Sequence, residues 1–161
     1  MANTSSNSVS ALLVGDFDSD ASLVRDVFQA NQWSLEHARD RRQALELLRR
    51  PVPVVVAEAS IPSWNWRDIL WDLHNLSHSA QLIITSRHAD EYLWSEVLNE
   101  GAFDLLAQPL ARDEVERAIA AAVRRGQGLQ ARPPFSPKKS VNKAASATYA
   151  EAPIFLQKNS C

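Results

Sequence analysis

Apolar and polar residues alternate along this chain in blocks that predict strands and helices in turn. Short, mostly apolar runs at residues 12–14, 52–57, 81–85 and 103–107 are typical of strands that are buried on both faces. Residues 33–38 alternate between apolar and polar side chains and predict an outer strand of the same sheet. The run at 52–57 is the most apolar and β-branched of the set, so we expect it at the centre.

Each predicted strand is followed by residues with apolar side chains at helical spacing. Asp18 or Asp20 is positioned to cap the first of these helices, and Asp40 is positioned to cap the second. Gly101 suits the left-handed C-cap that ends the fourth helix. We expect the fifth helix to end at Gly126, directly after two arginines that favour the negative end of a helix.

Five strand–helix units predict a parallel sheet with right-handed crossovers and with helices on both faces. Such sheets place their binding sites at the carboxyl ends of the strands. We expect a flexible N-terminus at residues 1–10 and the folded domain at residues 11–126. Residues 127–161 are rich in Gly, Pro, Ser, Lys and Ala and predict a disordered basic tail.

The charged residues are divided unevenly between these parts. Residues 1–126 hold 12 arginines and 18 acidic residues, a balance of −6, whereas residues 127–161 have a balance of +4. An acidic folded part argues against nucleic-acid binding by the domain itself. No apolar run approaches the about 20 residues that a membrane helix needs, and the only cysteine is Cys161. These features predict a cytoplasmic domain that binds neither nucleic acid nor membrane.

Polar residues stand where the inner strands end, at Asp16, Glu58, Thr85 and Gln108. Two carboxylates on adjacent strand ends suit a hard cation such as Mg²⁺. Alternatively, Asp16 caps a helix and Glu58 is a solvated loop acid, and the spacing alone favours this second interpretation. The four glycines form no phosphate-binding loop, which argues against a nucleotide-binding enzyme of this architecture.

Four segments around these strand ends occur in a characteristic order along the chain. Residues 12–16, 54–62, 83–86 and 101–109 resemble the receiver domain of two-component response regulators. The resemblance spans residues 11–125 and implies a flavodoxin-like α/β fold. That fold is a (βα)5 three-layer sandwich whose parallel five-stranded sheet has the order 2-1-3-4-5. The resemblance also implies a role in phosphorelay signal transduction and no enzymatic activity.

In this family an aspartate accepts a phosphoryl group from a histidine kinase, an acidic pair holds Mg²⁺, and a lysine contacts the phosphoryl oxygens. Carried over by position, the resemblance places Glu58 at the phosphoacceptor and Asp16 at the second acid. It places Thr85 at the switch hydroxyl and Gln108 at the lysine. The carbonyl of Ser60 corresponds to a metal ligand, so Asp16, Glu58 and Ser60 are expected to bind Mg²⁺ only weakly.

The chain departs from the family pattern where the chemistry occurs. Gly15 replaces the first acid, Glu58 is longer than the acceptor aspartate by one methylene, and Gln108 replaces the lysine. Leu105 occupies the usual aromatic switch position, and Trp66 stands where a glycine is common. Phosphoryl transfer depends on in-line positioning and on cationic stabilisation of the spreading charge. We therefore expect little or no phosphorylation and interpret the chain as a pseudo-receiver.

A pseudo-receiver is expected to act by binding a protein: a signalling protein, a histidine kinase or a second copy of itself. In the family, the face formed by helix 4, strand 5 and helix 5 is the common interaction surface, and here it includes Tyr92 and Trp94. Trp64 and Trp66, in a loop beside the pocket, are predicted to form a second contact patch. Trp71 is predicted to pack in the core.

Alternative interpretations remain at this stage. The alternatives are a functional phosphoacceptor receiver that a histidine kinase phosphorylates, an enzyme on a flavodoxin-like fold, and a domain whose tail is the functional element. The missing phosphate loop makes the enzyme the poorest of these. Arg87, just after Thr85, provides a cation that could fold back and neutralise Glu58.

Overall fold

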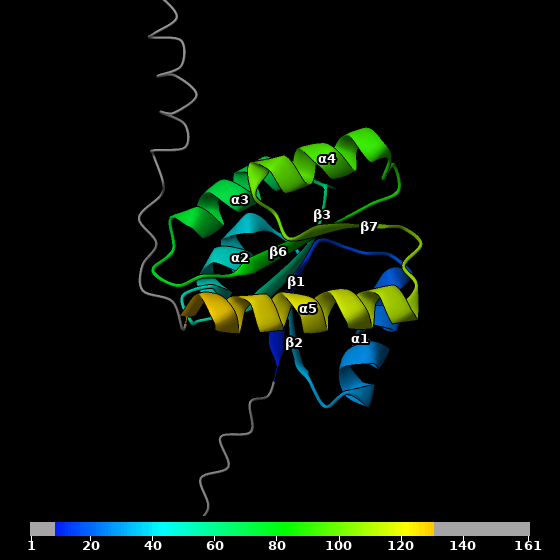
Figure 1. Ribbon diagram of the computed structural model, residues 1–161, viewed down its shortest axis with the longest axis horizontal. Helices are drawn as coiled ribbons and strands as arrows, with labels where there is room; N and C mark the ends of the chain where they lie inside the picture. Colours follow the sequence, from blue (N-terminus) through cyan, green and yellow to red (C-terminus); the bar gives the residue numbers. More distant parts are fainter. Residues whose placement is uncertain (1–8, 131–161) are drawn as a thin grey trace, which may run out of the picture. The chain divides into compact units, whose positions relative to one another are not determined.

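Five parallel strands form the central sheet of residues 9–130, the part of the chain that this computed structural model describes (Figure 1). The strands are β1 (Ser10–Val14), β2 (Ser34–Ala38), β3 (Val54–Glu58), β6 (Gln81–Ser86) and β7 (Asp104–Ala107). Their spatial order is β2-β1-β3-β6-β7, and every pairing is parallel. Counted within this sheet alone, the order is the predicted 2-1-3-4-5, so the predicted fold class is confirmed.

Five helices cover the two faces of the sheet (Figure 1). They are α1 (Asp20–Ala30), α2 (Arg41–Leu47), α3 (Trp66–His74), α4 (Glu91–Glu100) and α5 (Arg112–Gln130). One core cluster joins α1 and α5 to the sheet, and the other joins α2, α3 and α4 to its opposite face. Along β3, Val54 and Val56 enter the first cluster, whereas Val55 and Ala57 enter the second. This alternation explains why the central strand is apolar at successive positions.

The helix ends agree with the predictions in two places and differ in two others. The Asp40 carboxylate accepts a hydrogen bond from the Gln43 amide at 2.8 Å, and Gly101 ends α4 with a φ of 111°. At α1, however, the N-cap residue is Ser19 and no side chain caps the helix, so the predicted capping by Asp18 or Asp20 is wrong. In addition, α5 continues to Gln130, beyond the end predicted at Gly126.

A two-stranded antiparallel hairpin follows β3 directly and was not predicted. It consists of β4 (Ser60–Ile61) and β5 (Trp64–Asn65), and Ser63 turns the chain between them with a φ of 64°. The Asn65 side chain accepts hydrogen bonds from the first turn of α3, and the Asp68 carboxylate accepts one from the Asn65 amide. This capping box fixes where the hairpin ends and the helix begins.

The hairpin buries two tryptophans that were predicted to form a contact patch. Trp64 and Trp66 are only 2% and 4% exposed, so that prediction is wrong. Trp71, predicted to lie in the core, is 69% exposed on the outer side of α3, so that prediction is also wrong. The reason is the hairpin, which turns residue 64 inward, and the helix register of α3, which buries Ile69 and Leu70 and leaves residue 71 outside.

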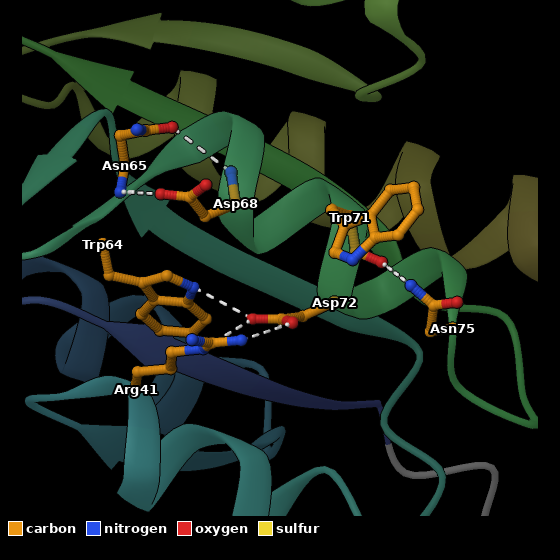
Figure 2. Close-up of polar contacts among 7 residues, drawn as sticks. All are labelled: Arg41, Trp64, Asn65, Asp68, Trp71, Asp72 and Asn75. Atoms are coloured by element: carbon orange, nitrogen blue, oxygen red, sulfur yellow. Dashed lines mark hydrogen bonds and ion pairs between the residues drawn. The ribbon is translucent and has the colours of Figure 1, made fainter.

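A carboxylate on α3 holds the hairpin in place (Figure 2). Asp72 accepts a hydrogen bond from the buried indole of Trp64 at 3.0 Å. It also accepts two hydrogen bonds from Arg41, the first residue of α2, at 3.0 and 2.9 Å. The pKa of Arg41 is raised because its guanidinium donates these bonds and lies beside the negative charge. The hairpin, α2 and α3 therefore meet at one carboxylate.

Candidate functional site

A pocket of about 190 Å³ lies at the carboxyl ends of β3, β6 and β7. Its lining residues are Asp18, Glu58, Ala59, Ser60, Thr85, Ser86, Arg87, His88 and Gln108. This is the edge of the sheet at which the sequence predicted a site. The structure thus brings Glu58, Thr85, Ser60 and Gln108 together around one cavity.

Glu58 points from the end of β3 toward the loop that joins β1 to α1. Its Oε2 atom accepts a hydrogen bond from the Asp16 amide at 2.9 Å. A Cβ atom at Gly15 would overlap this same oxygen and would lie 3.0 Å from Cγ of Glu58. Gly15 also has a φ of 125°, which side chains rarely adopt. The loss of the first acid and the longer second acid are therefore compatible, because Glu58 occupies the space that a side chain at position 15 would need.

The same loop, residues 15–20, receives side chains from the ends of the other strands. From β2, His37 Nε2 donates a hydrogen bond to the Gly15 carbonyl at 2.6 Å. Arg87, after β6, pairs with Asp18 at 2.6 Å, and Gln108, after β7, donates to Asp20 at 3.2 Å. With Glu58 from β3, each of the other four strands supplies one contact to this loop.

The histidine contact identifies its own tautomer. Arg25 Nη2 lies 3.3 Å from Nδ1 of His37, and an arginine can only donate. Nδ1 is therefore the acceptor, and Nε2 carries the proton that is given to the Gly15 carbonyl. The imidazole N–H of His37 therefore ties the Gly15 carbonyl to β2.

Of two predicted site residues, Thr85 lines the pocket and Asp16 does not. Thr85 is fully buried, lines the pocket and places Oγ1 3.5 Å from the Ala57 carbonyl. Asp16 is exposed and does not line the pocket, so the structure does not bring its carboxylate together with Glu58. Only the backbone amide of Asp16 reaches the Glu58 side chain.

The acidic residues fit a divalent cation poorly. Glu58 already accepts a hydrogen bond from the Asp16 amide, and Asp18 forms an ion pair with Arg87. The Asp20 carboxylate accepts a hydrogen bond from the side-chain amide of Gln108. Within residues 9–130, no group of three or more acidic, histidine or cysteine side chains is arranged to hold a metal ion. Magnesium demands near-ideal octahedral geometry and is usually held by one or two carboxylates plus water. Weak Mg²⁺ binding by Asp16, Glu58 and Ser60 stays a prediction.

Sequence reasoning missed the residues that hold the loop. Arg87 was considered as a partner for Glu58, but it pairs with Asp18 instead. No signal in the sequence indicated the contacts of His37 and Asp18, because their partners lie 22 and 69 positions away along the chain. Gln108 was placed correctly at the pocket, and its contact with Asp20 depends on a side-chain direction that strand order does not provide.

Solved structures with the same arrangement of strands are receiver domains. The chain is similar to the signal receiver domain of an HD domain-containing protein from Pseudomonas fluorescens Pf-5, with 25% identity and a TM-score of 0.66 over 75% of this chain and 98% of that one. For the receiver domain of the Francisella response regulator 1452, the identity is 23% and the TM-score is 0.65, over 73% and 98% of the two chains. No protein-family model matches the chain, and no curated protein sequence matches it.

A third structure, the signal receiver domain of a putative Luxo repressor protein from Vibrio parahaemolyticus, is 21% identical with a TM-score of 0.69 over 76% of this chain and 95% of that one. The fold is that of a response-regulator receiver domain. The resemblance predicted from the strand-end residues is thereby confirmed at the level of the fold. None of the helices within residues 9–130 is long and apolar enough to cross a membrane.

The chain also has a groove on the face formed by α4, β7 and α5. Trp94, Leu98, Phe103 and Leu105 are among the residues that line this space of about 470 Å³. Trp94 is 47% exposed, and Tyr92, near the start of α4, is 76% exposed. Both residues lie at the surface, as a contact role requires, and that role stays a prediction.

Proposed function

We propose that this receiver domain acts in signal transduction as a pseudo-receiver, which binds a protein partner without being phosphorylated. The observation that carries the proposal is the position of Glu58. Its carboxylate accepts a hydrogen bond from the Asp16 amide and occupies the space that a side chain at position 15 would need. The group at the phosphoacceptor position is thus already engaged with the β1–α1 loop.

The surroundings of Glu58 also oppose phosphoryl transfer. The family's lysine is replaced by Gln108, whose amide donates to Asp20, and the first lysine of the chain is Lys138. A missing cationic donor and a displaced nucleophile each slow such a reaction, the latter by about 10²-fold for a misplacement of about 1 Å. Both changes act in the same direction.

The contacts of the β1–α1 loop support a single, constitutive pocket state. The side chains of Glu58, His37, Arg87 and Gln108 contact the loop, in addition to the backbone hydrogen bond from the Gly15 amide to the Ala38 carbonyl. In this proposal they replace the cation and phosphoryl group that order the pocket in other members of the family. The partner contacts the α4, β7 and α5 face, where Tyr92 and Trp94 are exposed.

Intact mass spectrometry after incubation with acetyl phosphate and Mg²⁺ tests this proposal. We expect no added phosphoryl group on the native chain or on Glu58→Asp alone, because Gly15 and Gln108 are unchanged. The triple variant Gly15→Asp, Glu58→Asp, Gln108→Lys restores the family's groups and is expected to be labelled. A phosphoryl group that maps to Glu58 of the native chain would overturn the proposal and favour a functional phosphoacceptor.

A further inference from the structure

A second cavity, of about 320 Å³, lies at the opposite end of the sheet from the pocket that Glu58 lines. Its lining includes Gln81, the first residue of β6, together with Gly101 at the end of α4 and Arg125 near the end of α5. Residues from the second half of α3 and from the segment 75–80, which leads to β6, complete the wall. We call this space the amino-end cavity.

One wall of the amino-end cavity is apolar. Leu70 and Leu73 of α3 line it and are buried members of the core cluster that joins α2, α3 and α4 to the sheet. Leu76 and Ala80 also line it and are partly buried against the same cluster. Small-molecule sites typically combine such apolar walls with a few polar groups that fix the orientation of the ligand. The cavity therefore suits a ligand with an apolar body.

The polar side chains that line this cavity are of kinds that donate hydrogen bonds. They are Arg125, His74, His78, Ser77, Ser79 and Gln81. Within the described residues no acidic side chain belongs to the lining, although residues 1–126 have a balance of −6. Two acids adjacent in sequence to lining residues, Asp72 and Glu100, are not part of it, and Asp72 is paired with Arg41. This local excess of donors over acids favours an anion.

Arg125 is the cation that can hold such an anion. Its guanidinium carbon lies 5.9 Å from the centre of the Phe103 ring, and Arg125 forms no ion pair within residues 9–130. A contact with an aromatic face orients the guanidinium without neutralising its charge. The planar group can then donate two parallel hydrogen bonds to a carboxylate, whose single charge matches that of one arginine.

The helix ends beside the cavity do not need this arginine as a cap. At the end of α3, the amides of Asn75 and Leu76 donate to carbonyls of that helix. At the end of α4, the amides of Gly101 and Ala102 do the same. Terminal carbonyls are the groups that a basic side chain near a helix end would otherwise satisfy. Because these carbonyls already have donors, Arg125 is left to a ligand.

We propose that the amino-end cavity binds a small organic anion, a carboxylate with an apolar body. The carboxylate pairs with Arg125, and the apolar body packs against Leu70 and Leu73. This site is separate from the pocket at the carboxyl ends of the strands. It goes beyond the proposed function and does not depend on it.

A titration of the full chain with 3-phenylpropionate, followed by NMR chemical shifts at constant ionic strength, tests the proposal. We expect saturable shifts at residues 76–81 and near Arg125, with a dissociation constant of about 1 mM, which is typical of a probe this small. The matched controls are 3-phenylpropanamide, which has the same body without the charge, and acetate, which has the charge without the body. Each is expected to bind about tenfold more weakly or less well still.

Two neighbouring arginines provide matched variants. Arg125→Gln is expected to weaken binding by about tenfold or more, the effect of losing a charged hydrogen-bond donor. Arg124→Gln is expected to leave binding unchanged, because Arg124 does not line the cavity. Ser79→Phe, at an exposed position of the lining, adds a ring that competes for the space and is expected to abolish binding. Circular dichroism confirms that each variant is folded.

Three results would overturn the proposal. They are equal losses in Arg125→Gln and Arg124→Gln, equal binding of 3-phenylpropanamide and 3-phenylpropionate, and shifts that do not saturate by about 10 mM probe. The titration contains no phosphoryl donor, so its outcome is independent of whether Glu58 can be phosphorylated.

Discussion

Gly15 and Glu58 form a matched pair that explains two departures from the receiver pattern at once. A glutamate reaches the β1–α1 loop because it is longer than an aspartate, and it finds space there because residue 15 has no side chain. Either change alone would be unfavourable. Glycine without the glutamate leaves the loop amide without this acceptor, and the glutamate with a side chain at residue 15 produces an overlap.

A double-mutant cycle measures this dependence. Gly15→Ala is expected to lower the free energy of unfolding by about 2–3 kcal/mol, since a φ of 125° strains any side chain and the new methyl meets Glu58. In a Glu58→Ala background the same substitution is expected to cost about 1 kcal/mol less. Urea denaturation gives both values, and purely additive effects would show that the two residues do not contact each other.

At the scale of the elements, the β4–β5 hairpin determines which tryptophans are buried. Its strands are only two residues each, and it depends on contacts with α3 for its position. Asp72 supplies that contact through the Trp64 indole and at the same time binds Arg41 of α2 (Figure 2). The hairpin also carries Ser60, so its position affects the pocket wall.

Substitutions of Asp72 and of its partner Arg41 are expected to lower the free energy of unfolding by different amounts. Asp72→Ala leaves the buried Trp64 N–H without its acceptor and should lower the free energy of unfolding by about 1–3 kcal/mol. Arg41→Ala should cost less, because that side chain is 55% exposed and water replaces its contacts. Thermal or urea unfolding measures both, and a larger loss in Arg41→Ala would contradict the dominant role of the indole contact.

The elements that follow from local pattern were predictable, and those that depend on distant contacts were not. The Asp40 cap and the Gly101 C-cap follow from residue type and helical spacing, and both are confirmed. The hairpin contains only four strand residues with no alternation to detect, so the burial of Trp64 and Trp66 could not be foreseen. Asp18 was expected at a cap, but its carboxylate pairs with Arg87, which lies far away in sequence.

In the candidate site, too, some features could be predicted from the sequence and others could not. Strand order alone brings Glu58, Thr85 and Gln108 to one edge, and the structure has them there. The inward direction of the Glu58 carboxylate depends on the free space at Gly15, which only coordinates reveal. Residues 127–130 of the predicted disordered tail belong to α5, so the prediction is wrong there. Residues 131–161 lie outside the described residues, so the disorder predicted for them remains a prediction.

At the scale of the whole molecule, side chains at or just after the ends of four strands converge on one loop. In the proposed function they take the place of a metal-dependent pocket. This convergence makes a specific expectation for magnesium. For a dissociation constant of about 10 mM or weaker, 10 mM Mg²⁺ stabilises the fold by at most about 0.4 kcal/mol. Thermal unfolding of the native chain should therefore change little with Mg²⁺, whereas a rise of several degrees at millimolar Mg²⁺ would show a functional cation site.

The most direct measurement is the hydrogen-exchange rate of the Asp16 amide. In this structure that amide donates a hydrogen bond to the Glu58 carboxylate. We predict that Glu58→Ala accelerates exchange at Asp16 by about tenfold, the effect of losing one hydrogen bond to a charged group. The neighbouring Gly15 amide, which donates to the Ala38 carbonyl at 3.0 Å, serves as the internal control and should change little. An Asp16 rate that is unaffected by the substitution would mean that Glu58 is free, and would contradict the account of a pocket closed by its own side chains.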